Sequence, residues 1–535
     1  MTNGSHTIYL LKANIRQNLF RHLLWLVILV GMFAAMAGQF NNLFGTTAEI
    51  TTIMTTLKTP ALVSLFGEVT ATKPYTTADV FSSEMVIFMG MFMIFMNISL
   101  AVRNTRSQED SGLLEMIRSR KVGRVAPIYA TLIEILIINS LMGGLFILSL
   151  AVGKLNGATI AGDVLMGVSF AVIGILFGCI SIFLAQLTSS SRGAYFFSYG
   201  LFGIFYLLRM LTDMTNPKYT WLSPVGWIQK TEIYTNNNWL PIFVMVFSSF
   251  ICLFAGIKIA SRRDIGSGIF TPHSGRSQAS WFLNSPLRLL LKIERNSMLG
   301  WMLGGLILGA AYGSVFNSIG DIIGTNPTYK KILGVSAIND ANRDLLLNYL
   351  NMLALFFVAI AAISGLIVIF RLNSDEKKGY LEILHSKAIS KTKLANSYFL
   401  IGIGLSSCVF ILTLSGAFFI GNATISEPLA LKYFWQMLIG YLPTVLFFIG
   451  IGIFFCGVAP KLSLIAWLYL LAGLLMKMFG PLLNLSEKFE NFSPLGWMGK
   501  IPVEEVNYPL TVGLLAAFLV MITLSLIAYN KRDVI

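Results

Sequence analysis

The chain carries one short charged segment twice, and this segment is its clearest sign of chemistry. The first copy runs from Glu109 to Ser119 and the second from Glu376 to Ser386, at an offset of 267 positions (376 minus 109). Both copies follow the pattern Glu-x-x-Gly-x-Leu-Glu-x-apolar-x-Ser. The glycine punctuates the segment, and the apolar residues after it recur at a spacing of three. This spacing predicts a short helix with its second glutamate on another face.

A short, charged and duplicated helix offers a surface to which a soluble partner protein can bind. The alternative interpretation is an ordinary solvated loop, but such a loop has little reason to keep this pattern in both copies while the surrounding sequence diverges. We therefore predict a duplicated docking site. Its residues are Glu109, Gly112, Glu115 and Ser119 in the first copy and Glu376, Gly379, Glu382 and Ser386 in the second.

Two cations lie inside long apolar stretches at matching positions. Arg209 and Lys477 are separated by 268 positions (477 minus 209), and both lie toward the predicted outer ends of their stretches. A charge inside a bilayer is costly, so such residues either extend to the headgroups or have a function. One interpretation is that both side chains reach the outer headgroups. The other is a cationic ring at the outer exit of a pathway for an anionic or amphiphilic substrate.

One acidic residue lies well inside an apolar stretch. Glu134 is about one or two helical turns inside its stretch, and the matching position of the second half holds Ile401. Its carboxylate could pair with a basic residue or touch a substrate. Arg209, Lys477 and Glu134 are therefore the candidates for a substrate pathway.

The rest of the chain repeats on the same scale. Ser223–Trp227 matches Ser493–Trp497 with the pattern Ser-Pro-x-Gly-Trp, and Arg263-Asp264 matches Arg532-Asp533. These echoes predict a tandem duplication of one unit of about 265 residues. We expect a first repeat over residues 1–265, a cytoplasmic linker over 266–285 and a second repeat over 286–535.

The composition indicates a membrane protein. Hydrophobic residues make up 55% of the chain and charged residues 12%, with a mean hydropathy of +0.73, whereas soluble domains have about 25% charged residues. We predict an all-α polytopic fold of twelve transmembrane helices in two sets of six. They lie at roughly 23–43, 85–102, 128–152, 164–187, 194–212, 239–260, 297–317, 350–370, 398–420, 435–457, 463–482 and 508–529.

The basic residues predict the orientation. With both termini in the cytoplasm, about 26 of the 39 Lys and Arg residues fall on the inner side, as the positive-inside rule requires. The net charge of +14 is then a topology signal. It does not indicate a nucleic-acid partner, because the charge is divided among several inner loops.

The sequence contains no pattern of a catalyst. Gly153-Lys154 and Gly499-Lys500 are followed by Leu and Ile, so neither forms a phosphate-binding loop. The four Cys and four His residues have no spacing of a metal site or disulfide framework. We predict a transport subunit that has no ATPase site and no cofactor of its own.

The span plan and the repeated charged helix resemble the permease subunits of type-2 ATP-binding-cassette exporters. Two such units in one chain resemble the polyketide-antibiotic (tetronasin-type) exporter permeases of bacteria. The resemblance implies that the two charged segments are coupling helices that dock into two copies of a separate ATPase, which would bind ATP and Mg. It also implies a bacterial plasma membrane, contact with lipid, and a hydrophobic or amphiphilic cargo of the antibiotic or multidrug type.

Two other functions stay open at this point. An ion-coupled secondary transporter of the six-plus-six class would need carboxylates inside the membrane, and Glu134 is the clear candidate. A membrane sensor or scaffold of a resistance module is the third possibility. Dependence of transport on nucleotide hydrolysis distinguishes the exporter from both.

Overall fold

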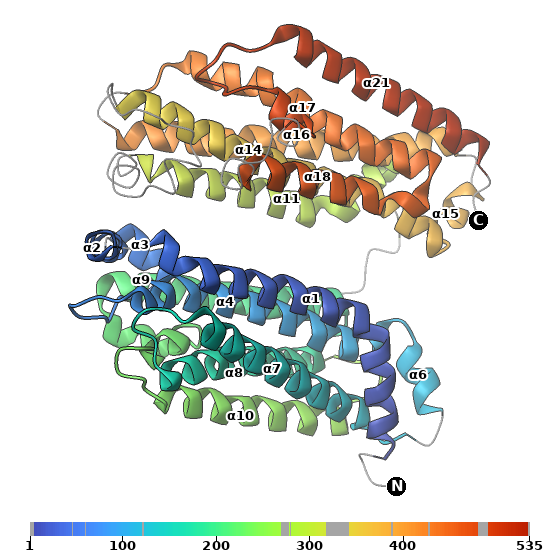
Figure 1. Cartoon of the computed structure of the whole chain (residues 1–535). Helices are drawn as coiled ribbons and strands as arrows, with labels where there is room; N and C mark the ends of the chain where they lie inside the picture. Colours follow the sequence, from blue (N-terminus) through green and yellow to red (C-terminus); the bar gives the residue numbers. More distant parts are fainter. Residues whose placement is uncertain are drawn as a thin grey trace. The chain divides into compact units, whose positions relative to one another are not determined.

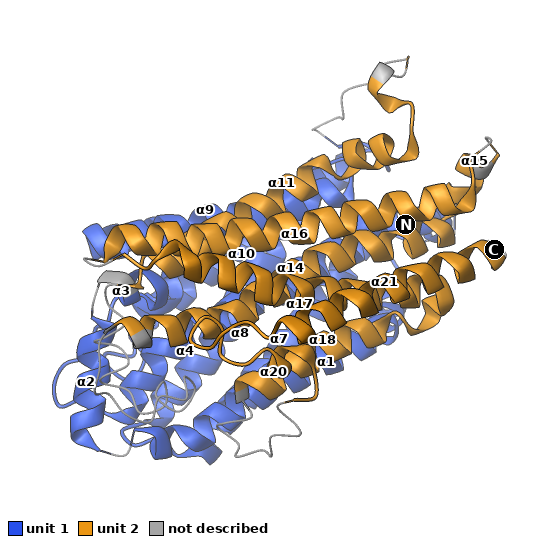
Figure 2. Ribbon diagram, turned by 90° about the horizontal axis from the view of Figure 1, so that it is seen from above, with its two compact units in different colours: residues 1–275 blue, residues 276–535 orange. Residues whose placement is uncertain are grey.

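The computed structural model describes residues 5–532, except 45, 59, 120–121, 269–277, 279, 317–341, 387–388, 426–427 and 480–490. The described residues form helices and the turns between them. They divide into two compact units, residues 1–275 and 276–535 (Figure 2). The repeat boundaries predicted from the sequence stay a prediction, because part of the connection lies outside the described residues.

Unit 1 is a bundle of six long helices built around α8. The long helices are α1 (Thr7–Leu43), α4 (Thr77–Val102), α7 (Ala126–Gly153), α8 (Ile160–Leu187), α9 (Ser191–Thr215) and α10 (Leu240–Arg262). Helix α8 packs against α4, α7, α9 and α10, while α1 packs against α7. The shorter elements are α2 (Thr47–Leu57), α3 (Pro60–Phe66), η1 (Arg103–Ser107), α5 (Gln108–Asp110), α6 (Leu113–Arg118), η2 (Pro217–Leu222) and η3 (Gly226–Thr231).

Unit 2 contains the corresponding long helices. They are α11 (Pro286–Gly313), α14 (Asn342–Lys377), α16 (Lys391–Thr424), α17 (Leu431–Val458), α18 (Leu464–Phe479) and α21 (Tyr508–Lys531). The main packing pairs join α16 to α11 and α14, and α17 to α14 and α21. Its shorter elements are η4 (Trp281–Leu283), α15 (Tyr380–His385), η6 (Pro460–Leu462) and α20 (Pro494–Trp497).

Eleven helices of the described chain are long and apolar enough to cross a membrane. The predicted seventh span, 297–317, corresponds to α11, which is not among the eleven. Its glycines lower its hydropathy, and residues from 317 onward lie outside the described part. The count of twelve spans and the orientation of the termini therefore stay predictions.

The glycines of α11 bring it close to α16. A Cβ atom on Gly309 would lie 2.0 Å from the carbonyl oxygen of Thr413, and one on Gly313 would lie 2.5 Å from that of Ala417. Both distances are below van der Waals contact, so each position has room for glycine alone. Small residues at this spacing allow helices to pack backbone to backbone in a membrane, and here they do so within one chain.

The two helices that precede the repeated charged segments are longer than a bilayer requires. The apolar helix that contains α4, η1 and α5 spans Thr77–Asp110, 34 residues, and α14 has 36 residues. At 1.5 Å per residue each is about 50 Å long, compared with about 30 Å of hydrocarbon. One end of each helix therefore projects from the membrane, and α6 and α15 follow those ends. Figure 1 shows α6 at the end of unit 1 where α1 begins, and α15 at the end of unit 2 where α21 ends.

Candidate functional site

The two repeated charged segments have the same backbone structure. Gly112 has a φ of +74° and Gly379 a φ of +71°, a left-handed conformation that costs other L-residues roughly 1–2 kcal/mol. No heavy atom lies within 4 Å of a Cβ built on either glycine. The requirement for glycine therefore comes from the backbone turn and not from lack of space. Each turn ends a long helix and begins a helix of six residues, α6 or α15.

The hydrogen bonds of the two turns also match. The amide of Gly112 donates to the carbonyl of Glu109 at 3.0 Å, and that of Gly379 to the carbonyl of Glu376 at 2.9 Å. At the other end, the hydroxyl of Ser119 donates to the carbonyl of Met116 and that of Ser386 to the carbonyl of Ile383, both at 2.8 Å. The predicted helix is thus present in both copies, although Pro127 follows only the first.

Each short helix buries one side and exposes the other. Leu114 and Leu381 are buried, which anchors α6 and α15 to their units. Glu115 and Glu382 are exposed. Beside them, Met116 is 65% exposed and Ile383 is 66% exposed. Each helix therefore presents a carboxylate next to a large apolar side chain, a combination that suits contact with a soluble protein better than an idle solvated surface.

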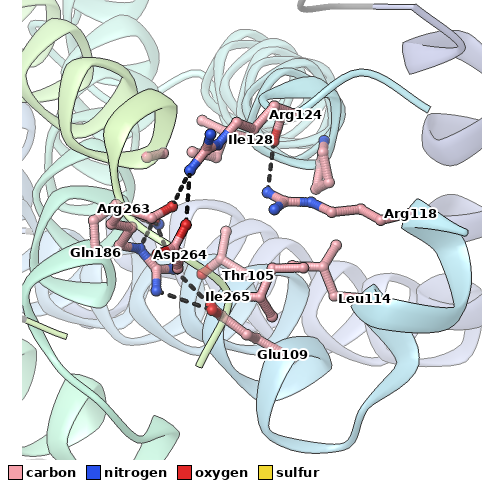
Figure 3. A pocket seen from close by; sticks show the side chains of 12 residues that line it. Thr105, Glu109, Leu114, Arg118, Arg124, Ile128, Gln186, Arg263, Asp264 and Ile265 are labelled. Atoms are coloured by element: carbon pink, nitrogen blue, oxygen red, sulfur yellow. Dashed lines mark hydrogen bonds and ion pairs between the residues drawn. The ribbon is translucent and has the colours of Figure 1, made fainter. Parts of the chain in front are cut away.

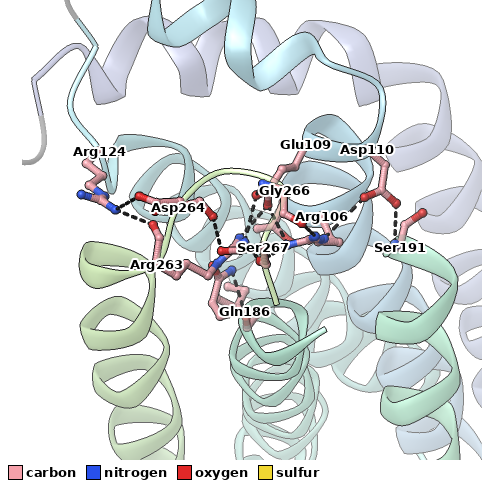
Figure 4. Close-up of polar contacts among 12 residues, drawn as sticks. Arg106, Glu109, Asp110, Arg124, Gln186, Ser191, Arg263, Asp264, Gly266 and Ser267 are labelled. Carbon is pink, nitrogen blue, oxygen red and sulfur yellow. Dashed lines mark hydrogen bonds and ion pairs between the residues drawn. The ribbon is translucent and has the colours of Figure 1, made fainter. Parts of the chain in front are cut away.

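In unit 1, Glu109 is held by a cluster of donors that sequence reasoning did not bring together. Its carboxylate lies 2.6 Å from Nη2 of Arg263, the residue after α10, and accepts a further bond from Nη1 at 2.9 Å. The amide of Gly266 donates to it at 2.6 Å, and Arg106 lies 3.2 Å away. Figure 4 shows these residues converging between the end of α10 and the end of α5. Glu109 therefore fastens the last helix of unit 1 to the segment that precedes α6.

Unit 2 contains the same pair. Arg532, the residue after α21, forms an ion pair with Glu376. The positions are offset by 267 (376 minus 109) and 269 (532 minus 263), so the pair belongs to the repeated pattern. Charged groups that form such bidentate contacts are held in one orientation more firmly than point-to-point pairs.

A third residue completes the arrangement in each unit. Arg124, shortly before α7, donates to the backbone carbonyl of Arg263, and Lys391, the first residue of α16, donates to the carbonyl of Arg532 at 2.8 Å. We call each trio an arginine clamp: Glu109, Arg263 and Arg124 in unit 1, and Glu376, Arg532 and Lys391 in unit 2. Each clamp ties the residue after the last long helix of its unit to two segments that lie at least 139 positions earlier in the sequence.

The clamp arginines also reach another long helix. Nε of Arg263 donates to Oε1 of Gln186 on α8 at 3.1 Å, and Nη1 of Arg532 lies 3.4 Å from the carbonyl of Cys456 on α17. The offset between Gln186 and Cys456 is again 270 (456 minus 186). The segment before each short helix is therefore tied to the ends of several long helices.

A small cavity of about 30 Å³ lies beside the clamp of unit 1. Figure 3 shows Arg118 and Arg124 on one side of it and Glu109 with Arg263 on the other. Nη2 of Arg118 donates to the carbonyl of Arg124 at 2.8 Å. Burial, and to a smaller extent the charge of Arg124, lowers the pKa of Arg118. The cavity has room for about one water molecule.

Arg209 lies inside unit 1 and does not extend to its surface. Its side chain is fully buried. It donates to the carbonyls of Ser64 and Leu65 at 2.6 and 3.2 Å and lies 3.3 Å from Asp213. These bonds connect the end of α3 to α9. Lys477, at the matching position of α18, is half-buried. A role of either residue in a substrate pathway stays a prediction.

Glu134 is also buried and occupied by protein partners. Its carboxylate accepts from Asn18 at 2.9 Å and from Asn104 at 2.7 Å, and it lies 2.8 Å from Nε2 of His22. The network connects α1, η1 and α7. In unit 2 an acid on the first helix, and not on the third, makes such a connection. Glu294 on α11 forms an ion pair with Arg371 on α14. A role of Glu134 in contacting substrate stays a prediction.

Comparisons with known proteins show that the chain is similar to permeases. Residues 283–530 match the family model described as "Multidrug efflux system permease Rv1217c, C-terminal domain". The chain is also 25% identical over 469 residues to the multidrug efflux system permease protein Rv1217c of Mycobacterium tuberculosis. That alignment covers 83% of this chain and 81% of the relative.

These similarities support a permease of the ATP-binding-cassette type. The chain is a multi-pass membrane protein of a bacterial plasma membrane. Its similarity to permeases favours a transport subunit over a catalytic one. Neither the tetronasin-type subclass nor the tandem repeat follows from the comparisons.

Proposed function

We propose that the chain is the membrane-spanning permease of an ATP-driven exporter, which moves hydrophobic or amphiphilic compounds of the antibiotic or multidrug type out of the cell. Hydrolysis takes place in two copies of a separate ATP-binding-cassette ATPase, which bind ATP and Mg. The observation that carries this proposal is the duplicated short helix, with the same glycine turn and the same arginine clamp in both units. The similarity to a multidrug efflux permease supports it.

The geometry suggests how force from an ATPase reaches the membrane. Glu115 with Met116, and Glu382 with Ile383, form the exposed tips that the two ATPase copies contact. When ATP closes the ATPase pair, the tips move with it. Each clamp connects the segment that precedes α6 or α15 to the ends of the long helices. Movement of the tip therefore shifts those helices together as a rigid group.

We propose that the two units are tandem repeats of one ancestral permease half. The four matched positions of the clamps and of the helix beside them, at offsets of 267–270, support a duplication, with six spans in each half and both termini in the cytoplasm. Helix α11 is then the first span of the second half. Two equivalent tips suit two equivalent ATPase copies, and movement of the tips toward each other would change the access of a cargo site from the inner to the outer side.

The experiment that tests the function is transport in inside-out membrane vesicles that contain the chain with its ATPase. We expect uptake of an amphiphilic dye that requires ATP and is blocked by vanadate. A protonophore with ATP intact is the control, and it should leave uptake largely unchanged. Uptake that persists without the ATPase, or that the protonophore abolishes, would contradict the proposal and favour an ion-coupled transporter.

A further inference from the structure

Helix α4 is almost entirely buried, and its open side is a single stripe. Between positions 84 and 99, the residues that are not buried are Glu84, Phe88, Met91, Phe92, Phe95 and Ser99. Their spacing of three and four positions places them on one face of the helix. Phe88 is 37% exposed. Three aromatic rings and a methionine therefore form an accessible apolar stripe with a carboxylate at its outer end.

Glu84 differs from the other acids of the apolar helices. Glu134 accepts from two asparagines, Asp163 from Tyr234 at 2.6 Å, and Asp213 from Gln229 at 2.9 Å. Among these acids, in the part of the chain that the structure describes, Glu84 alone has no hydrogen bond or ion pair. A carboxylate without a partner in an apolar helix is costly, and such residues usually have a function.

The rings of the stripe continue onto α9. Phe88 and Phe92 meet edge to face, with centroids 5.0 Å apart. Phe95 contacts the ring of Tyr199 in the same manner at 5.9 Å, and Tyr199 stacks on Tyr195 at 6.2 Å. The two aromatic surfaces of α4 and α9 thus form one continuous wall that begins beside Glu84 (Figure 1 shows both helices).

Unit 2 has an apolar stripe of the same spacing on α14, but this stripe carries no acid. Its members that are not buried are Met352, Phe356, Ile360, Ile363 and Ile367. They stand 268 positions (352 minus 84) after the residues of the α4 stripe, so a methionine replaces the carboxylate and isoleucines replace two of the three aromatic rings. The neighbouring polar residue, Asn351, accepts a hydrogen bond from the hydroxyl of Tyr441 at 2.7 Å. The two units therefore share the open face, whereas the carboxylate and two of the rings belong to unit 1 alone.

We infer that the stripe of α4 binds cationic amphiphilic compounds, with Glu84 pairing with the positive charge and the aromatic side chains receiving the apolar body. A carboxylate in a region poor in water attracts a cation far more strongly than one in bulk water. Aromatic faces add a cation–π attraction, and methionine adapts to ligands of different shape. Such a compound would be a cargo of the exporter proposed above, so the inference rests on that function.

The direct test is equilibrium binding to the purified full-length chain, which needs no ATPase. Tetraphenylphosphonium and tetraphenylborate have nearly the same shape and opposite charges. We expect the wild-type chain to bind the phosphonium, and Glu84→Gln to weaken that binding by at least about tenfold. Binding of the borate should not weaken, and Glu84→Asp should keep part of the phosphonium affinity.

Two controls separate recognition from damage to the fold. Glu505→Gln removes an exposed acid of the segment before α21, and Phe250→Leu removes an exposed ring of α10. Both should leave phosphonium binding unchanged, whereas Phe88→Leu should weaken it. The melting temperature of Glu84→Gln should not fall below that of the wild type, because Glu84 has no protein partner to lose and its unpaired charge is costly. Equal phosphonium binding by the wild type and Glu84→Gln would overturn the inference, as would a wild type that prefers the borate.

Transport then separates the inference from the function on which it rests. In inside-out vesicles with the ATPase, Glu84→Gln should lose uptake of the phosphonium and keep ATP-dependent uptake of a neutral dye. If the wild type transports both probes and Glu84→Gln also transports both, the stripe is not the recognition site, while the exporter function stands. If the wild type binds phosphonium through Glu84 but moves neither probe with ATP, the proposed function fails instead.

Discussion

Glu109 and Arg263 form an ion pair of 2.6 Å between two segments that lie 154 positions apart in the sequence. Glu376 and Arg532 form the same pair in the second unit, 156 positions apart. In both units the glutamate immediately precedes a glycine turn and the arginine immediately follows the last long helix. The pair therefore joins the beginning of the short charged helix to the end of its unit, and it is the contact through which movement of that helix would reach the membrane.

The first prediction concerns the clamp of unit 2, where Arg532 forms an ion pair with Glu376. Glu376→Arg or Arg532→Glu should each lower ATP-dependent efflux by about tenfold, since a hydrogen bond to a charged group contributes about 1.5–3 kcal/mol. The double reversal should restore much of the activity. The measurement is efflux per copy of inserted protein, together with co-purification of the ATPase, which should persist in every variant. A double variant no better than the worse single variant would count against a clamp.

The second prediction concerns the glycine turns. Gly112→Ala and Gly379→Ala should each cost roughly 1–2 kcal/mol at the turn, because alanine is disfavoured at a φ near +70°. We expect reduced stimulation of the ATPase by its cargo in a protein that still inserts. Gly304→Ala is the matched control, because its Cβ also has open space around it but the residue is helical. If all three variants behave alike, the turn conformation has no special role.

The third prediction concerns the exposed tips. The double variant Glu115→Ala and Glu382→Ala should insert normally and lose co-purification with the ATPase and ATP-dependent efflux. Removal of exposed carboxylates should not disturb folding, and the control Glu505→Ala, also exposed, should keep both properties. Normal co-purification and efflux in the double variant would refute the assignment of α6 and α15 to docking.

The fourth prediction distinguishes the possible roles of Arg209. Because it is fully buried and bonded to Ser64, Leu65 and Asp213, Arg209→Ala should destabilise unit 1 by roughly 3–5 kcal/mol, the usual cost of breaking a buried pair. The detergent-solubilised variant should melt at a clearly lower temperature than Lys477→Ala. A normal melting temperature with a selective loss of transport would instead place Arg209 in the substrate pathway.

The sequence predicted the local features well, because they depend on neighbouring residues. The pattern Glu-x-x-Gly-x-Leu-Glu is enough to indicate a short helix after the glycine, with its glutamate on another face from its apolar residues, and the structure contains such a helix in both units. Long apolar stretches likewise identify spans, since a bilayer selects for length and hydropathy. Helix α11 is the exception, because its close packing on α16 requires glycines, which lower its hydropathy.

The contacts between distant segments could not be predicted in this way. Arg263-Asp264 and Arg532-Asp533 were visible as an echo, but nothing local shows that each arginine meets a glutamate more than 150 positions earlier. One acidic and two basic residues that recur at offsets of 267–269 were the available signal. Glu84 was missed for another reason. It lies one residue before the predicted span 85–102, and an acid just outside a span is not unusual, so nothing in the sequence indicated that it has a function.

The most direct measurement of the central claim is site-specific photo-crosslinking from the two tips to the ATPase. A photoreactive residue at Met116 or Ile383, the exposed apolar side chains of α6 and α15, should give a covalent adduct with the co-expressed ATPase from both positions. The same residue at Phe250 on α10 should give none. Adducts from both tips would confirm two equivalent docking sites. Tips that give no ATPase adduct, or that react with a reagent confined to the cell exterior, would contradict the account.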